Sequence, residues 1–362
     1  MKYNVAIVGA TGMVGQRFIT LLQNHPWFNI KLLAASSHSA GKSYKDAVSG
    51  KWLLQSSIPN NVIDMPVYDA MDIDYIASQV DMVFCAVNMP KSEIMVLEES
   101  YAKSGLAVIS NNSANRMVDD VPMLIPELNG DHSKIIEAQR KRLNTDTGFI
   151  AVKPNCSIQS YVPAIYPLLQ FEPQSISVCT YQAISGAGKT FETWPEMIDN
   201  VIPYIAGEDE KSEIEPLKIF GEIKNNKIIL KDNIKISAQC LRVSASDGHM
   251  AAVSVKFNNK PSKSEILNAW QNMNNLARQD MLPSSPDTFI RYFEENDRPQ
   301  TRLDRDLEHG MGISIGRLRE DNIFDYKFVS LSHNTVRGAA GGAILMAESL
   351  ARKGYIYEKR TI

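Results

Sequence analysis

Apolar residues change between strand-like and helix-like spacing several times over the first 150 positions of the chain. Short apolar runs typical of buried strands occupy 3–9, 30–35, 81–87 and 106–110. Stretches with helical spacing occupy 14–22, 71–79, 91–103 and 132–143. Regular alternation of this kind predicts an α/β fold with a Rossmann-like, doubly wound parallel sheet, whose ligands bind at the carboxyl ends of the strands.

Beyond residue 154 the alternation weakens and the strand-like runs become longer. They occupy 175–184, 227–231, 234–244 and 250–257. We expect a mostly antiparallel sheet with helices on one face, an α+β domain. An apolar helix at 343–351 is expected to return to the first domain. The predicted division is 1–153 with 337–362, and 154–336; the polar segment 144–148 is the best local boundary signal.

Composition limits the classes of function. A chain of 362 residues with 44% hydrophobic residues, 22% charged residues and a net charge of −3 can bury the cores of two globular domains. With a pI near 6.1 and no basic cluster, we expect no nucleic-acid partner. Neither an apolar run long enough for a membrane span nor a signal peptide is evident, so we expect a cytoplasmic protein. Four cysteines without a CxxC pair predict neither disulfides nor a metal site.

A glycine-rich turn, Gly9-Ala10-Thr11-Gly12-Met13-Val14-Gly15, joins the first predicted strand to the first helix. Its spacing, G-x-x-G-x-x-G, differs from the dinucleotide fingerprint G-x-G-x-x-G at the second glycine. Glycines still let the backbone approach a pyrophosphate, and the helix N-terminus still offers N–H donors. The turn therefore favours dinucleotide binding, with a plain glycine turn as the alternative.

The second predicted strand ends in Ser36-Ser37, and Lys42 follows closely. An NAD site usually has an acid at this strand tip for the ribose 2′-hydroxyl, but the first acid after the strand is Asp46. Hydroxyls and a lysine can hold a 2′-phosphate that a carboxylate would repel. The sequence therefore favours NADP, unless this is simply a polar loop.

Cys156 is the best candidate for a nucleophile. It lies in the turn 153–159, between a strand-like run at 149–152 and an apolar run that we expect to be a helix. A helix N-terminus lowers the pKa of a thiol, so we predict a reactive thiolate here. Cys85, Cys179 and Cys240 lie inside strand-like runs and are expected to be inert.

A thiol nucleophile needs an acid or base, and His249 is the best placed histidine. It ends the segment 244–249, which we interpret as a hairpin between strands, where a histidine is more often a surface residue. Arg242 lies within the preceding strand, and a charge there is either paired or binds a ligand such as a carboxylate. Arg116 belongs to a polar cluster at 111–116 that follows a strand and is equally consistent with a solvated loop.

Four motifs together resemble the aspartate-β-semialdehyde dehydrogenase family. They are the glycine turn 9–15, Pro154-Asn155-Cys156-Ser157, the segment 181–188, and Arg242-Val243 followed by Asp247-Gly248-His249. The resemblance runs essentially from end to end. The chain length and the segment 334–342 are most similar to the archaeal and fungal branch. Lys153 departs from the family, in which most members have asparagine before the proline.

The resemblance implies roles for individual residues. Cys156 corresponds to the acyl-thioester nucleophile, His249 to the acid/base, Asn155 and Gln182 to residues that orient the substrate, and Arg242 to the arginine that binds its α-carboxylate. Glu208 would meet the amino group, and Lys211 and Arg116 the phosphate, although Asp209 and Glu210 leave the register of Glu208 and Lys211 open. The implied cofactor contacts are Gly9, Thr11, Gly12, Met13, Val14, Ser36, Ser37, Ser113, Ser185, Gly186, Gly188, Asn334 and Thr335.

The family reaction is the NADPH-dependent reduction of L-4-aspartyl phosphate to L-aspartate 4-semialdehyde with release of phosphate, a step toward lysine, methionine and threonine. The resemblance also implies a homodimer or homotetramer in which the second domain carries catalysis and dimerisation. Malonyl-CoA reductase is an alternative, but it needs no amine contact and so has no use for Glu208. N-acetyl-glutamyl-phosphate reductase has glycine where this chain has Asn155. A non-catalytic NADP-binding protein is the remaining alternative.

Overall fold

The computed structural model describes residues 2–278 and 280–358. Its first sheet has the order β3-β2-β1-β4-β5-β6, and every pairing is parallel. The strands are β1 (Tyr3–Val8), β2 (Phe28–Ala35), β3 (Val67–Asp69), β4 (Met82–Cys85), β5 (Ala107–Ser110) and β6 (Phe149–Val152). The predicted doubly wound parallel sheet is confirmed.

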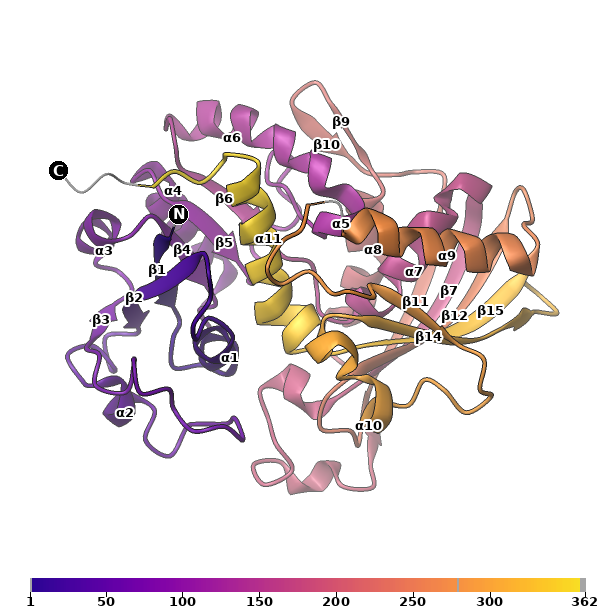
Figure 1. Cartoon of the computed structure of the whole chain (residues 1–362), viewed down its shortest axis with the longest axis horizontal. Helices are drawn as coiled ribbons and strands as arrows, with labels where there is room; N and C mark the ends of the chain where they lie inside the picture. Colours follow the sequence, from indigo (N-terminus) through magenta and orange to yellow (C-terminus); the bar gives the residue numbers. More distant parts are fainter. Residues whose placement is uncertain (1, 279, 359–362) are drawn as a thin grey trace.

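Helices cover both faces of this sheet because alternate residues of each strand are apolar on opposite sides. Val5 and Ile7 face the core shared with α1 (Met13–Leu21) and α11 (Gly341–Arg352), whereas Ala6 and Val8 face the core shared with α3 (Ile73–Gln79) and α4 (Lys91–Lys103). The C-terminal helix α11 does return to the first sheet, and Figure 1 shows it between the two sheets. The remaining helical segments here are α2 (Tyr44–Ala47), α5 (Pro126–Asn129), η1 (Gly130–Ile135) and α6 (Ile136–Leu143).

The second sheet has the order β13-β14-β15-β12-β7-β11-β8. Its strands are β7 (Pro173–Gln182), β8 (Val201–Ile202), β11 (Lys235–Val243), β12 (His249–Phe257), β13 (Ile290–Phe293), β14 (Ile313–Glu320) and β15 (Tyr326–Ser332). It is mixed, because β11 runs parallel to β7 and β13 runs parallel to β14. The predicted strand at 227–231 lies outside it, since β10 (Lys227–Ile229) pairs with β9 (Glu222–Lys224) in a separate hairpin.

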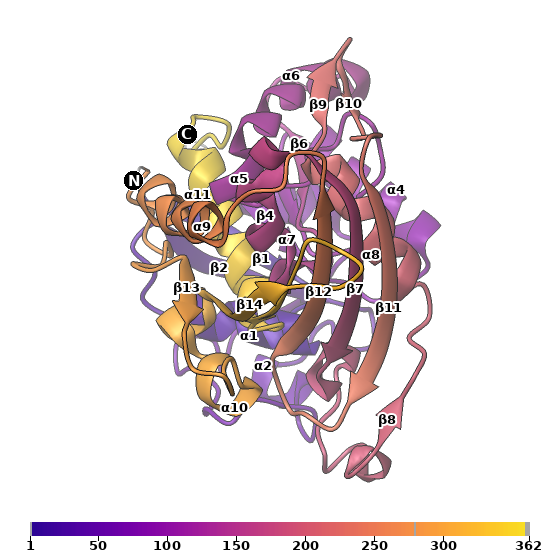
Figure 2. The ribbon, with the colours of Figure 1, turned by 90° about the vertical axis from the view of Figure 1, so that its right-hand side faces the viewer.

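The predicted hairpin between residues 243 and 250 is wrong. β7 lies between β11 and β12, and pairs with both. The segment 244–248 therefore crosses the end of β7 instead of forming a tight turn between neighbouring strands. Figure 2 shows the three long strands side by side, with one broad face of the sheet toward the viewer. This order places the C-terminal ends of β7 and β11 and the N-terminal end of β12 side by side at one end of the sheet.

The segment after Cys156 differs from the sequence prediction. The apolar run after Cys156 does not form a single helix. It is divided into η2 (Ile158–Ser160), α7 (Val162–Ile165) and η3 (Tyr166–Phe171), and Pro163 and Pro167 lie at its breaks. The other helical segments are η4 (Ile184–Ala187), η5 (Pro195–Met197), α8 (Glu208–Ile219), α9 (Lys263–Ala277), α10 (Thr301–Asp304), η6 (Leu307–Gly310) and the π-helical turn η7 (Val336–Ala340).

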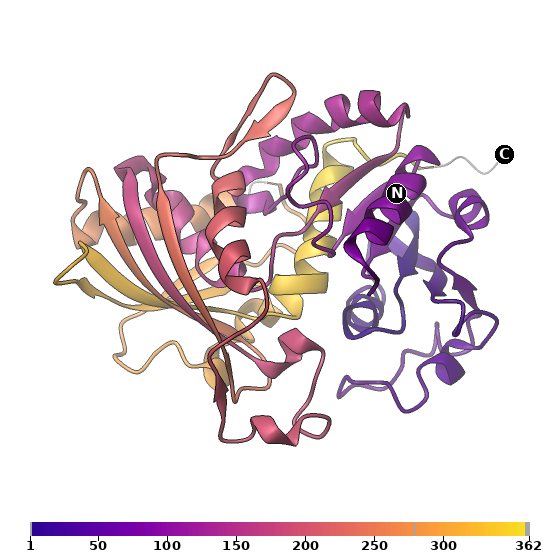
Figure 3. The ribbon, with the colours of Figure 1, turned by 180° about the vertical axis from the view of Figure 1, so that it is seen from behind.

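Two of these helices position the second sheet. α9 begins at a capping box between Ser262 and Glu265 and buries Trp270 against the sheet. α8 packs on β11, and Figure 3 shows it, in salmon, between the second sheet and the first domain. The proposed domain limits, 1–153 with 337–362 and 154–336, fall between the two sheets and stay a prediction. Among the described residues, no helix has the length and apolar character that crossing a bilayer requires.

Candidate active site

Four predicted site residues meet where the two sheets approach each other. Gln182 ends β7, Arg242 lies at the same level of β11, His249 begins β12, and Cys156 lies in the turn after β6. The Sγ atom of Cys156 is 3.5 Å from Nε2 of His249. The strand order of the second sheet brings these residues together. Because β11 is parallel and β12 antiparallel to β7, the C-terminal ends of β7 and β11 and the N-terminal end of β12 lie at the same end of the sheet.

The turn that carries Cys156 is fixed on both sides. The backbone N–H of Lys153 donates to the carbonyl of Ser110 (2.8 Å), and the N–H of Asn155 donates to the carboxylate of Glu215 (2.7 Å). The side-chain oxygen of Asn155 accepts from the N–H of Ser157 (2.7 Å). Gly338 packs directly on the nucleophile, since a Cβ added there would lie 2.9 Å from the Cβ of Cys156. The glycine of the C-terminal segment therefore makes room for the cysteine.

The predicted lowering of the thiol pKa by a helix is wrong. Only the three-residue η2 follows Cys156, and a segment this short provides little dipole. Burial raises the pKa of the Cys156 thiol, and the charge of Glu208 adds to the rise. The opposing influence comes from side-chain cations, namely Lys153, Arg116 and Arg242. Thiolate stabilisation at this site is therefore a property of the surrounding charges.

The other three cysteines lie in strands, as predicted. Cys85 and Cys240 are buried and Cys179 is half-buried. Burial raises the pKa of each thiol, in the case of Cys240 to about 11. Among the described residues, only Cys156 has a histidine within hydrogen-bond distance of its sulfur.

His249 is fully buried and its proton is positioned by the backbone. Burial, reinforced by the charge of Arg242, lowers the pKa of the imidazole to about 3, so the ring is neutral at physiological pH. Its Nδ1 accepts the backbone N–H of Ala183 (3.0 Å). The single ring proton therefore resides on Nε2 and faces the sulfur of Cys156. His249 is set up to donate a hydrogen bond at the reacting atoms.

Arg242 is buried and points to the same place as His249. One of its Nη atoms donates to the carbonyl of Ala183 (2.7 Å), and no carboxylate among the described residues forms an ion pair with it. Gly186 lies against both side chains, because a Cβ there would lie 2.8 Å from Nη1 of Arg242 and 3.0 Å from Nε2 of His249. A buried guanidinium without a carboxylate partner beside the nucleophile is suited to bind an anionic substrate group.

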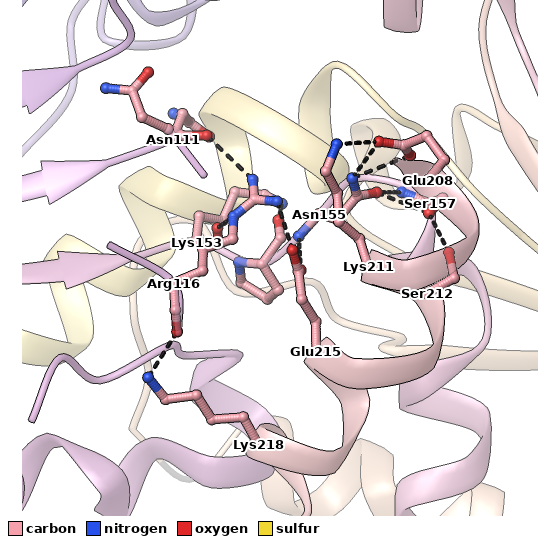
Figure 4. A network of polar contacts seen from close by, with 12 residues as sticks. Asn111, Arg116, Lys153, Asn155, Ser157, Glu208, Lys211, Ser212, Glu215 and Lys218 are labelled. Atoms are coloured by element: carbon pink, nitrogen blue, oxygen red, sulfur yellow. Dashed lines mark hydrogen bonds and ion pairs between the residues drawn. The ribbon is translucent and has the colours of Figure 1, made fainter. Parts of the chain in front are cut away.

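Helix α8 provides a polar face to the site, shown in Figure 4. Glu208 accepts from Lys211 (2.8 Å), from the side-chain amide of Asn155 (3.0 Å) and from that of Gln182 (3.3 Å). Asp209 points elsewhere, since its carboxylate accepts the backbone N–H of Cys240 (2.7 Å). The structure therefore places Glu208 and Lys211 at the site.

Sequence reasoning missed Glu215, which organises the other end of this face. It forms a buried ion pair with Arg116 (2.8 Å), whose remaining nitrogens donate to the carbonyls of Lys153 and Asn111. Lys218, also missed, donates to three carbonyls of the segment 116–121. The available signal was the spacing of charged residues along α8, at positions 208, 211, 215 and 218, which places them on one helix face.

The predicted cofactor loop lies at the carboxyl end of β1. Gly9 has φ +93°, and a Cβ there would lie 2.3 Å from the carbonyl oxygen of Ala86, so the tight turn requires glycine. Gly12 caps α1, and a Cβ there would have, within 4 Å and apart from its chain neighbours, only the carbonyl oxygen of Gly9 (3.7 Å) among the described residues. Thr11, Met13 and Val14 complete the turn. This open backbone at the start of a nine-residue helix fits a pyrophosphate.

The strand tips beside this loop carry the predicted ribose contacts. Ser36 and Ser37 are exposed directly after β2. Sequence reasoning missed Asp69, which ends β3 and pairs in register with Ala35. Its carboxylate already accepts the backbone N–H of Met71 (2.9 Å). The residues directly after β2, where an NAD site usually has an acid, are Ser36 and Ser37 and not Asp69. Their hydroxyl groups fit the 2′-phosphate of NADP.

A cavity of about 710 Å³ lies between the two domains and includes two predicted cofactor residues, Met13 and Ser185, in its lining. Met13 and Arg17 line it from the first domain, and Ser185 and Ser246 from the second. Ser185 accepts from the side chain of Asn334 (2.8 Å), whose oxygen accepts the N–H of Gly248 (2.8 Å). Thr335 follows Asn334, Gly188 has open space around it, and Ser113 lies in the loop after β5. A larger cavity of about 890 Å³, beside 281–287, contains none of the predicted site residues.

Comparison with known proteins gives consistent matches over the whole chain. Residues 4–136 match the family model described as "Semialdehyde dehydrogenase, NAD binding domain", and residues 165–337 match "Semialdehyde dehydrogenase, dimerisation domain". Aspartate-semialdehyde dehydrogenase of Archaeoglobus fulgidus is 42% identical over 358 residues, covering 98% of this chain and 100% of the relative. The Saccharomyces cerevisiae enzyme is 38% identical over 368 residues, covering 98% and 99%. The structure of the Candida albicans enzyme with NADP has a TM-score of 0.84 at 36% identity, covering 98% of this chain and 100% of that one.

Proposed function

The chain belongs to the aspartate-semialdehyde dehydrogenase family, and we propose that the site around Cys156 performs the family reaction, the NADPH-dependent reduction of L-4-aspartyl phosphate to L-aspartate 4-semialdehyde with release of phosphate. The observation that carries this proposal is the 3.5 Å approach of the Cys156 sulfur to Nε2 of His249, beside a buried arginine that no carboxylate of the described chain pairs with. Such an arrangement is suited to a thiolate nucleophile acting on an anionic acyl substrate.

The charged groups around Cys156 complement each part of aspartyl phosphate. Arg242 binds the α-carboxylate, and Glu208 accepts from the α-ammonium group. Lys211 and Arg116 bind the phosphate, Arg116 through the guanidinium hydrogens that Glu215 and the backbone leave available. Asn155 and Gln182 hold Glu208 in place, because both side-chain amides donate to it. The amine contact distinguishes this substrate from malonyl-CoA.

Bond formation and cleavage then follow from the positions of Cys156 and His249. The thiolate attacks the acyl carbon, a C–S bond forms, the C–O bond to phosphate breaks, and phosphate leaves. NADPH, when bound, supplies the hydride that reduces the thioester. His249 donates from Nε2 to the oxygen that becomes anionic in this step, and takes the proton back as the aldehyde forms and the C–S bond breaks. The thiolate is thereby regenerated.

The dinucleotide would occupy the cavity between the domains. The glycine turn 9–15 holds the pyrophosphate, Ser36 and Ser37 hold the 2′-phosphate, and Ser185, Gly186, Gly188, Asn334 and Thr335 line the nicotinamide end. Gly12 supports this placement, because it is the N-cap of α1 and the space beside its Cα is open to a ligand. Ser113 contributes from the loop after β5.

We also propose a dimer formed through the open face of the second sheet. Alternate residues of β7 and β11 are exposed on this face. Tyr181, Val201 and Tyr204 expose large apolar surface near this face. A second copy covering it matches the dimerisation domain named for residues 165–337. A thiolate enzyme of this kind requires a reducing compartment, which supports a cytoplasmic location.

Cys156→Ala tests the proposal. The variant is expected to bind NADPH like the wild type and to lose activity with aspartate semialdehyde, phosphate and NADP to less than roughly a hundredth of the wild-type rate. Cys179→Ala, at the half-buried strand cysteine, serves as the matched control and keeps its activity. Retained turnover in Cys156→Ala, or greater activity with malonyl-CoA than with the aspartyl substrate, contradicts the proposal.

A further inference from the structure

Lys153 is buried directly behind the nucleophile. The residue is 2% exposed. Its Nζ donates to the carbonyl of Pro154 (2.7 Å), which lies two residues before Cys156. The far side is closed by α11, where a Cβ at Gly342 would lie 3.2 Å from the Cε of Lys153. The ammonium is therefore enclosed between the nucleophile turn and the C-terminal helix.

Several other cations near Cys156 have carboxylate partners, whereas the buried Arg242 has none among the described residues and donates to the carbonyl of Ala183. Arg116 pairs with Glu215, Arg337 pairs with Glu127, and Lys211 pairs with Glu208. Within the described residues no carboxylate forms an ion pair with Lys153, and its Nζ donates only to the carbonyl of Pro154. A buried ammonium in this situation is costly unless an anion lies nearby.

We propose that Lys153 is a positioning residue whose buried ammonium stabilises the thiolate of Cys156. This inference rests on the proposed function, in which that thiolate is the nucleophile. His249 can donate a hydrogen bond to the sulfur but cannot accept the thiol proton, because its Nδ1 already accepts from Ala183 and its Nε2 already carries the ring proton. Deprotonation of the thiol therefore depends on nearby positive charge.

Lys153 and Cys156 shift each other's pKa toward the charged form. Burial lowers the pKa of Lys153 to about 7, and among the neighbouring charges the thiolate of Cys156 raises it most. Conversely, Lys153 comes first among the cations that lower the pKa of Cys156. The charged and titratable groups that face the two side chains are Arg116, Glu215, Arg337, Glu208, Arg242 and His249. Each group favours the charged form of the other, which opposes the effect of burial on both pKa values.

The test is the pH dependence of Cys156 alkylation in Lys153→Met, which keeps the length of the side chain without its charge. Iodoacetamide reacts with the thiolate, so the rate of modification at the Cys156 peptide, followed by mass spectrometry in the absence of substrate, reports the thiolate fraction. We expect the midpoint to move up by about one pH unit or more, the usual effect of an opposite charge within a few ångströms. The plateau rate at high pH is expected to be unchanged.

The control is Lys218→Met, which also removes a buried ammonium, but one whose Nζ donates to three carbonyls and is not among the charges that lower the pKa of Cys156. Its alkylation midpoint should equal that of the wild type. As a second readout, kcat/KM of Lys153→Met should fall about tenfold at pH 7, the equivalent of one pH unit, and recover toward the wild type at high pH. Recovery with pH separates a charge effect from damage to the fold, and a Lys153→Gln variant repeats the test if the methionine variant misfolds.

An unchanged midpoint in a folded Lys153 variant overturns the proposal, and so does an equal shift in Lys218→Met. Failure of the proposed function is separate, because it would appear as enzyme that remains active after Cys156 is fully alkylated.

Discussion

Removal of Glu215 should destabilise the protein strongly, because this carboxylate supports both Arg116 and the nucleophile turn. The ion pair is 2.8 Å long, and its side chains are 9% and 4% exposed, so Glu215→Leu leaves a buried guanidinium without its counter-charge. Breaking a buried pair on one side costs about 3–5 kcal/mol. The N–H of Asn155 also loses its acceptor. For a chain of this length the loss corresponds to a fall in Tm of about 4–7 °C.

Urea unfolding at one fixed protein concentration measures the effect, with steady-state kinetics beside it. The double variant Arg116→Met/Glu215→Leu removes both charges and should recover most of the stability, since paired removal is often close to neutral. It should not recover activity, because the proposed mechanism uses Arg116 to bind phosphate. Glu222→Leu is the matched control: its ion pair with Lys224 is exposed, so the loss should stay below about 1 kcal/mol. A Glu215→Leu protein as stable as the control refutes this reasoning.

Four further changes probe the site. Arg242→Lys should raise KM for aspartate semialdehyde by about 2–3 kcal/mol of binding, because an ammonium lacks the fork that holds a carboxylate; wild-type kinetics would make Arg242 structural. His249→Asn should lower kcat by roughly 10² to 10⁴ with little change in KM; an effect on KM alone would assign the proton to another group. Gly186→Ala should reduce kcat/KM by about tenfold or more, because its Cβ would lie 2.8 Å from Nη1 of Arg242; normal kinetics would show that the loop adjusts freely. Ser37→Asp should narrow the preference for NADP over NAD in kcat/KM, by repelling the 2′-phosphate; an unchanged ratio would place the 2′-phosphate elsewhere.

The sequence determined the features that depend on local pattern. Apolar runs alternating with helical spacing are sufficient to predict the parallel sheet, since each strand and helix is defined within about 20 residues. The glycine turn 9–15 and the Pro154-Asn155-Cys156 turn were recognisable for the same reason. The inert character expected of Cys85, Cys179 and Cys240 followed from their strand-like surroundings, and each does lie in a strand.

The tertiary structure decided what depends on contacts distant in sequence. Nothing local to 234–257 indicates that β7 enters between β11 and β12, yet that insertion brings Arg242 and His249 to Gln182. Helix α8 was not predicted, because Glu208 and Glu215 occupy its buried face where apolar residues would give a helical pattern. The charge state of the nucleophile was likewise not local, because a short 3₁₀ turn replaces the expected helix. The cations that act on Cys156 come from three separate segments of the chain, whose proximity only folding creates.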